Sequence, residues 1–145
     1  MTYVVAYLAV LIVFGTIDAV WLTTMGPLLY RPALGDILAP ALRVAPAIAF
    51  YLLYPVGIVV FAVLPGLRAQ SPLAAAALAL LFGALAYATY DLTNYATLRN
   101  WTLPITVVDI GYGALASGIA AAASGDCARS PGSTANTTMP TGYSR

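Results

Sequence analysis

The sequence predicts an all-α integral membrane protein: a bundle of four antiparallel transmembrane helices followed by a disordered polar tail. The first observation behind this prediction is composition, because the 145 residues are 61% hydrophobic and only 8% charged. An ordinary globular domain is roughly half apolar and about a quarter charged. The second observation is that four apolar runs are each long enough to cross the roughly 30 Å of bilayer hydrocarbon, which takes about 20 helical residues.

The four predicted spans cover residues 3–24, 44–64, 73–95 and 103–124 of a membrane domain that we place at residues 1–124. Ser71 and Pro72 open the third span as a helix cap followed by a first-turn proline. Thr102 and Pro104 open the fourth span in the same way. Pro55 lies inside the second span, where it removes one backbone hydrogen bond. We therefore expect a kink before Pro55 and a neighbouring helix that covers the freed carbonyl group.

The segments between the spans are short or rich in proline and glycine. The first connection, residues 25–43, is the longest, and the turns at 65–71 and 96–102 are short, so consecutive helices should run antiparallel. No positive charge precedes the first apolar run and no small-residue cleavage site ends it, which predicts a retained span and not a signal peptide. Residues 125–145 lack an apolar period and are rich in Gly, Ser, Thr and Pro, so we expect a disordered tail.

Composition also excludes several classes of protein. The chain has no histidine and Cys127 is its only cysteine, so zinc, haem and iron–sulfur sites built from those ligands are excluded within one chain, and we expect no cofactor. We interpret Cys127 as an incidental free thiol. A formal net charge of +1 gives no electrostatic reason to bind nucleic acid, and the expected partners are membrane lipids. The arginines near the span ends are too evenly divided between the two faces to orient the protein.

Three aspartates lie inside the predicted spans. Asp18 and Asp91 are in the last third of the first and third spans, and Asp109 is in the first third of the fourth. Because the helices alternate in direction, all three should lie at similar depth near one face of the membrane. An aspartate at the middle of a span costs about 2.5–3.5 kcal/mol on insertion scales. We therefore expect these carboxyl groups to point into the bundle and to form one site.

Polar residues at helical spacing extend this predicted site. On the third span Asn94 and Thr97 follow Asp91 in steps of three residues, which places them along one side of the helix. On the fourth span Thr106 precedes Asp109 by three residues. All five are candidate ligand-binding residues. The same side of the fourth span continues with small residues that favour close helix packing: Gly113, Ser117 and Ala121.

Two tyrosines and one arginine complete the candidates. Tyr51 and Tyr54 lie deep in the second span, where their hydroxyl groups need partners and a neighbouring carboxyl is a natural one. Arg99 is either a counter-ion for one of the aspartates or a side chain that reaches the lipid phosphates. The remaining large aromatic residues near this face are interpreted as an interfacial belt: Trp21, Tyr30 and Trp101.

The sequence leaves three functions open. The first is binding or transport of a proton, a cation or a small molecule, for which four short helices would have to self-associate into a homo-oligomer. The second is a membrane enzyme acting on a lipid or another apolar substrate, with Asp18, Asp91 and Asp109 as ligands of a hard cation or as a general base. No nucleophile with a neighbouring base is visible, so enzymatic activity stays undecided. The third is a structural or assembly partner.

Several short runs follow one another in a characteristic order. They are Asp18 with Trp21-Leu22, Phe50-Tyr51-Leu52-Leu53-Tyr54 with Gly57, Tyr87-Ala88-Thr89-Tyr90-Asp91-Leu92-Thr93-Asn94 with Ala96-Thr97-Leu98 and Trp101, and Val107-Val108-Asp109-Ile110. With these runs, residues 3–124 resemble the bacterial predicted membrane proteins catalogued as domain of unknown function 2177. The resemblance implies a small multi-pass protein of the bacterial cytoplasmic (inner) membrane and brings no established reaction, ligand or cofactor.

Overall fold

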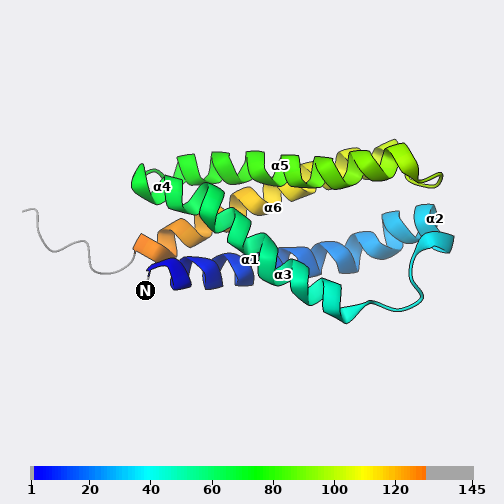
Figure 1. Ribbon diagram of the computed structural model, residues 1–145, viewed down its shortest axis with the longest axis horizontal. Helices are drawn as coiled ribbons and strands as arrows, with labels where there is room; N and C mark the ends of the chain where they lie inside the picture. The colour runs from blue at the N-terminus through cyan, green and yellow to red at the C-terminus, as the bar shows by residue number, and fades with distance from the viewer. Residues whose placement is uncertain (1, 130–145) are drawn as a thin grey trace, which may run out of the picture.

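Four long helical segments make up the computed structural model of the protein, which describes residues 2–129 (Figure 1). In chain order the elements are α1 (Thr2–Met25), the π-helical turn η1 (Gly26–Tyr30), α2 (Arg31–Leu34), the 3-10 turn η2 (Gly35–Ile37), α3 (Val44–Ile58), the π-helical turn η3 (Val59–Val63), α4 (Leu64–Arg68), α5 (Pro72–Thr97) and α6 (Leu103–Arg129). The described residues contain no β-strand.

Four helical runs are long and apolar enough to cross a membrane: residues 3–34, 44–68, 72–97 and 103–125. The predicted all-α membrane bundle is therefore confirmed. Figure 1 shows the N-terminal end of α1, the turn between α4 and α5 and the end of α6 together at one end of the molecule. The connections from α2 to α3 and from α5 to α6 lie at the opposite end, which we call the loop end. Consecutive spans thus run antiparallel, as the short connections predicted.

The predicted start of the third span is confirmed in detail. α5 begins at Pro72, and the Ser71 side chain accepts a hydrogen bond from the Ala74 backbone N–H at 3.1 Å. This bond satisfies one of the donors that the first helical turn leaves without a partner. α6 likewise begins at Leu103, beside the Thr102 and Pro104 pair that predicted its start.

The first connection is shorter than predicted, because the chain stays helical from residue 25 to Ile37. Pro27 and Pro32 lie in η1 and α2, where each removes one backbone donor from the continuous helical run. The wide ring of a π-helical turn also gives the chain room to pass a proline. The first helical run of 32 residues is about 48 Å long at 1.5 Å per residue, so its last turns extend beyond the roughly 30 Å of hydrocarbon.

The fourth helix is longer than predicted at its C-terminal end. α6 ends at Arg129, whereas the sequence predicted an end at residue 124 and a disordered tail from 125. The extra turn contains no proline, and the first one after it is Pro131. The rest of the predicted tail, residues 130–145, lies outside the described residues.

A hydrogen bond from the neighbouring helix lies close to the proline inside α3, but on the carbonyl next to the one that the proline frees. Pro55 cannot donate to the carbonyl group of Tyr51, four residues earlier. The next carbonyl group, that of Leu52, accepts a hydrogen bond from the Tyr7 hydroxyl of α1 at 3.0 Å. The π-helical turn η3 follows one turn later. α3 is therefore tied to α1 one residue from the carbonyl that Pro55 leaves without its helical donor.

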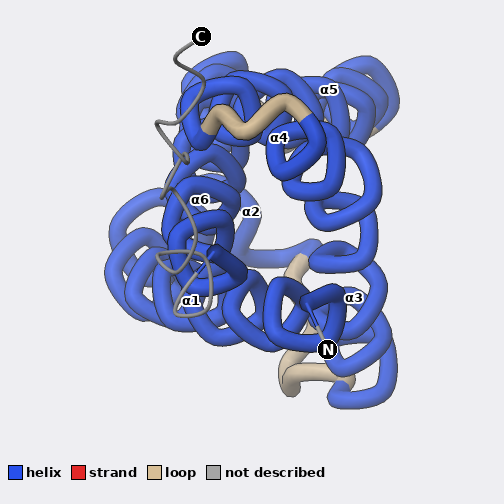
Figure 2. The backbone as a smooth tube through the Cα atoms, turned by 90° about the vertical axis from the view of Figure 1, so that its left-hand side faces the viewer, coloured by secondary structure: helices blue, strands red, loops and turns tan. Residues whose placement is uncertain are grey.

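α6 is the central helix of the bundle. It packs along α5 and along α1, while α3 starts against α1 and its continuation η3 reaches α5. Figure 1 shows α3 crossing the bundle diagonally, and Figure 2 shows it on the side opposite α6. α6 is accordingly the helix whose side chains are most enclosed by protein.

Glycines set the close approach of α5 and α6. A Cβ atom added to Gly83 would overlap the backbone carbonyl of Gly113 and the side chain of Ser117, and one added to Gly113 would overlap the ring of Tyr87. The small residues predicted on the fourth span therefore do serve packing. These contacts also fix the register, since Gly83 lies opposite Ser117 and Tyr87 lies opposite Gly113.

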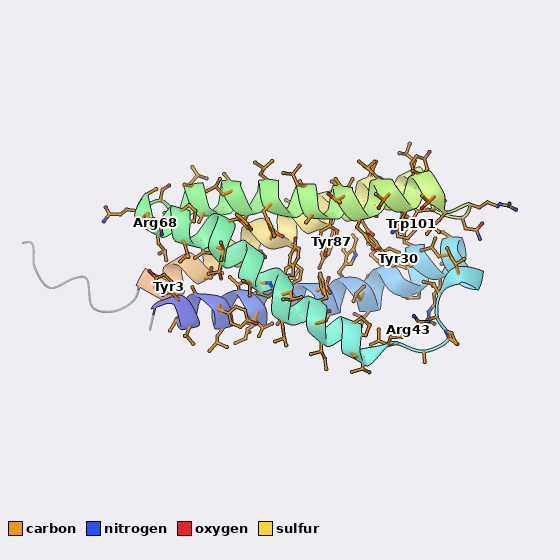
Figure 3. The ribbon with its side chains drawn as sticks, viewed as in Figure 1. Tyr3, Tyr30, Arg43, Arg68, Tyr87 and Trp101 are labelled. Atoms are coloured by element: carbon orange, nitrogen blue, oxygen red, sulfur yellow. The ribbon has the colours of Figure 1, made fainter. Side chains whose placement is uncertain are left out.

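The interior is divided into an apolar half and a polar half. Near the N-terminal end of α1 the fully buried side chains include Val10, Phe14, Ile58 and Ala62. Toward the loop end the buried side chains include the three membrane aspartates and one threonine: Asp18, Asp91, Asp109 and Thr106. Figure 3 labels Tyr87, Tyr30 and Trp101 at the centre and the loop end, with Tyr3 and Arg68 at the opposite end. The candidate site therefore lies in the loop half of the bundle.

Candidate functional site

Asp18 is held by two tyrosine hydroxyls from two other helices. The Tyr51 hydroxyl of α3 donates to Asp18 Oδ2 at 2.5 Å, and the Tyr112 hydroxyl of α6 donates to Asp18 Oδ1 at 2.7 Å. Only 5% of Asp18 is exposed. Both carboxylate oxygens are therefore satisfied inside the protein, and the group connects α1, α3 and α6. We call these three residues the Asp18 clasp.

Tyr54 lies beside the clasp but does not contact a carboxyl group. Its hydroxyl is 2.9 Å from Ser117 Oγ. The Ser117 hydroxyl donates its only proton to the carbonyl of Gly113 at 2.7 Å, so Tyr54 must be the donor to Ser117. The two predicted tyrosines thus have different partners: Tyr51 binds an aspartate, and Tyr54 joins α3 to α6 through a serine.

Asp109 is held by a second pair of aromatic residues. The Tyr30 hydroxyl donates to Asp109 Oδ1, and it accepts a hydrogen bond from Trp21 Nε1 at 2.9 Å. The Trp21 ring also stacks on Tyr112, with centroids 4.0 Å apart and an interplanar angle of 11°. The prediction that Trp21 and Tyr30 belong to an interfacial belt is therefore wrong, because their polar atoms bind each other and a buried carboxylate.

The π-helical turn η1 explains how Tyr30 reaches Asp109. Tyr30 follows Asp18 by 12 residues, and a regular α-helix would place them about 120° apart around the axis. A π-helical turn absorbs about one extra residue, which reduces this angle to about 20°. The extra residue is visible in the backbone, where the Arg31 N–H donates to the Gly26 carbonyl five residues earlier. The turn therefore brings Tyr30 onto the side of the helix that faces α6.

Asp91 is the exception among the three aspartates. It is 0% exposed, and neither of its carboxylate oxygens has a hydrogen-bond partner among the described residues. The register of α5 and α6 pairs Gly83 with Ser117 and Tyr87 with Gly113. One more turn of each helix pairs Asp91 with Asp109. The site thus contains two facing carboxyl groups, of which one is bound by Tyr30 and one by no protein group.

A second unpartnered group lies at the loop end. Trp101 is 8% exposed, and its Nε1–H has no hydrogen-bond acceptor in the described part of the chain. Its ring makes an edge contact with Tyr90 at a centroid distance of 5.6 Å. It also packs with Leu34 of α2 and Ile105 of α6. Trp101 is therefore a buried residue of the bundle and not part of the predicted belt.

The other predicted candidates are peripheral to this arrangement. Thr106 is buried and donates to the Thr102 carbonyl at 3.2 Å. Thr97 is exposed and donates to the Thr93 carbonyl at 2.7 Å, so both hydroxyls are already used by the backbone. Asn94 is half-buried one turn beyond Asp91. Arg99 is exposed, which fits a contact with lipid phosphates better than a role as counter-ion.

A metal site made of all three aspartates is not formed. Among the side chains that the structure describes, no three acidic, histidine or cysteine groups come together in an arrangement that would hold a metal ion. Both oxygens of Asp18 are already bound by its two tyrosines, whereas Asp91 and Asp109 face each other across α5 and α6. Only the facing pair is left as a candidate binding site.

Two residues of the site were not among the predicted candidates. Tyr112 follows Asp109 by three residues on the same side of α6, so helical spacing alone was a usable signal for it. Tyr30 gave no such signal, because its position depends on the π-helical turn. Both bind aspartates that were predicted.

The fold and the buried carboxyl groups define a multi-pass membrane protein with a four-helix bundle and a polar network in one half of it. The family described as "Predicted membrane protein (DUF2177)" matches residues 3–125 of this sequence. The chain belongs to this family, which confirms the resemblance seen in its sequence. No curated protein and no solved structure matches the chain.

Proposed function

We propose that this protein binds a proton or a small monovalent cation at the facing carboxyl groups of Asp91 and Asp109. The observation that carries the proposal is the complete burial of Asp91 with both oxygens unpartnered among the described residues. A buried ionised carboxylate without a partner costs several kcal/mol. A bound proton or cation removes that cost, whereas nothing else described around Asp91 does.

The different surroundings of the three aspartates support a division of roles. Asp18 accepts two hydroxyl hydrogen bonds and links three helices, which is a structural task. Asp109 accepts one hydrogen bond from Tyr30 and faces Asp91. Two carboxyl groups that face each other without a positive side chain favour sharing one proton or one cation. Asp91 is thus the exchanging group and Asp109 its fixed partner.

Infrared spectroscopy of the protein in lipid tests this proposal. The difference spectrum between acidic and alkaline conditions should contain a C=O band of a protonated carboxyl group that is lost in Asp91→Asn. Asp18→Asn is the matched control, and it should keep the band while lowering thermal stability. Titration with sodium or potassium at fixed pH shows whether a cation competes with the proton. A wild-type protein with no such band and no response to either cation contradicts the proposal.

A second candidate function rests on a separate observation. An apolar groove of about 690 Å³ lies between α1 and α6, and its lining includes Trp21, Tyr112 and Leu115. Tyr112 is the residue that donates to Asp18. The apolar lining suits an acyl chain, and Tyr112 is a lining residue whose hydroxyl would serve an enzyme that acts on lipid. Activity on an extracted lipid pool that disappears in Tyr112→Phe would favour this function, and its absence would leave the groove as a lipid contact only.

Two further expectations belong with this proposal. The resemblance of the sequence favours the bacterial cytoplasmic membrane as the location of the protein. Transport, as distinct from binding, calls for a homo-oligomer, because four helices enclose little volume. Mass measurement of the protein in lipid nanodiscs tests the second expectation, which a monomer would contradict.

A further inference from the structure

Two buried side chains of opposite hydrogen-bonding character lack partners in the loop half. Asp91 offers acceptor oxygens, and Trp101 offers a donor N–H. They are the only buried side chains among the described residues whose polar atoms have no partner. Leaving a buried donor or acceptor unsatisfied costs about 1–3 kcal/mol for a neutral group and more for a charged one. Native proteins avoid this cost by binding water or a ligand there.

Both groups border the same residue, Tyr30. The Tyr30 hydroxyl donates to Asp109, which faces Asp91 across α5 and α6. The Tyr30 ring packs against the cluster of Leu34 and Trp101 that also contains Ile105. The unpartnered donor and the unpartnered acceptor therefore belong to one neighbourhood.

The chemistry of the two groups selects the ligand. A bare metal cation would satisfy Asp91 but offers no acceptor to the N–H of Trp101. An anion would accept from Trp101 but would be repelled by two carboxyl groups. A molecule that both donates and accepts hydrogen bonds satisfies both, and water is the smallest such molecule. Complete burial of Asp91 favours the smallest ligand.

We propose that a short string of water molecules joins the Asp91 carboxyl to the Trp101 indole N–H and delivers the proton to Asp91 from the loop end. The inference rests on the proposed function, and it narrows the proposed ligand of Asp91 from a proton or a cation to a proton. A protonated water in the string gives its proton to a carboxylate oxygen of Asp91 and becomes neutral water, and the reverse step returns the proton. The titratable groups beside Asp91 are Asp109, which faces it from α6, and Tyr30 of η1, which binds Asp109. Trp101 keeps its own proton throughout and orients the string.

The first test uses the protein unchanged. The chain has two tryptophans, so its NMR spectrum contains two indole N–H signals, which Trp21→Phe assigns. The Trp21 N–H is bound by Tyr30 and should show no cross-peak to water. The Trp101 N–H should show a strong one. The absence of a water cross-peak at Trp101 overturns the inference.

The second test measures how fast Asp91 exchanges its proton. In Trp101→Phe a smaller aromatic ring replaces the indole and the N–H is lost. Hydrogen–deuterium exchange of the Asp91 carboxyl band should therefore slow about tenfold, the factor that one hydrogen bond of ordinary strength controls. Tyr95→Phe, which removes an exposed hydroxyl at the same end, is the matched control and should exchange like wild type.

The outcomes separate the two proposals. Unchanged exchange in Trp101→Phe overturns the water string while leaving proton binding at Asp91 intact. A wild-type protein that shows neither the Asp91 band nor a response to sodium or potassium overturns the proposed function itself. If Trp101→Phe does not fold, the water cross-peak of the wild-type indole decides the question alone.

Discussion

Replacing Tyr112 by phenylalanine removes a single hydroxyl group from the Asp18 clasp. The change leaves Asp18 Oδ1 without its donor at 2.7 Å, and with 5% of Asp18 exposed water cannot take its place. The phenyl ring keeps the stacking contact with Trp21. Only the hydrogen bond is therefore tested.

The expected loss in free energy of unfolding follows from two ranges of hydrogen-bond strength. Hydrogen bonds to charged groups contribute about 1.5–3 kcal/mol, whereas interhelical hydrogen bonds in a membrane protein average about 0.6 kcal/mol and reach about 1.7. The two ranges overlap near 1.5 kcal/mol, which is the loss in free energy of unfolding that we expect for Tyr112→Phe. Tyr51→Phe should cost less, since Tyr51 is only half-buried. The double variant should cost more than the sum, because it leaves a buried carboxylate with no donor.

Reversible unfolding in mixed micelles, followed by circular dichroism, measures these losses. Tyr95→Phe removes a hydroxyl from a tyrosine that is 46% exposed, and it should change the free energy of unfolding by less than about 0.5 kcal/mol. A Tyr112→Phe variant as stable as Tyr95→Phe would refute the clasp, since it would show that Asp18 does not depend on this donor.

Two more predictions concern the backbone. The side chain of Leu28 in η1 is 69% exposed. Deleting this residue should turn η1 into a regular α-helical turn and leave Tyr30 facing Asp109 on α6. A deletion within the regular part of α1 is the control, because it should rotate Tyr30 by about 100° around the helix axis. Unaltered thermal unfolding and an unshifted Trp indole signal check this, and loss of the fold contradicts it. Gly113→Ala should lower the free energy of unfolding by about 1–3 kcal/mol or more, because the added Cβ atom overlaps the ring of Tyr87. Gly111→Ala is the control: its Cβ atom meets nothing within 4 Å, so it should be neutral in the same unfolding assay.

The spans could be predicted from the sequence because their cause is local. In lipid each backbone polar group must be satisfied within its own helix, so about 20 apolar residues and a cap such as Ser71 define a span without knowledge of its neighbours. The burial of Asp18, Asp91 and Asp109 followed from the cost of exposing a carboxyl group to hydrocarbon. These features depend on composition and spacing, which the sequence displays directly.

The partners of the aspartates could not be predicted in the same way. Tyr30 faces Asp109 only because a π-helical turn shifts the helical register, and nothing in the run from Gly26 to Tyr30 reveals that turn. Likewise, Asp18 and Asp91 each lie in the last third of a predicted span, yet one receives two hydroxyl groups and the other none. That difference arises from how α1, α3 and α5 are placed around α6, which is a property of the assembled bundle.

Carbon-13 NMR of the aspartate carboxyl groups tests the central claim most directly. The chain has five acidic residues, all of them aspartate, so selective labelling gives five signals, and Asp91→Asn identifies the one that matters. The Asp91 signal should move between its protonated and ionised positions as pH or cation concentration is changed. An Asp91 signal that stays constant over the same changes would contradict the assignment of the binding site.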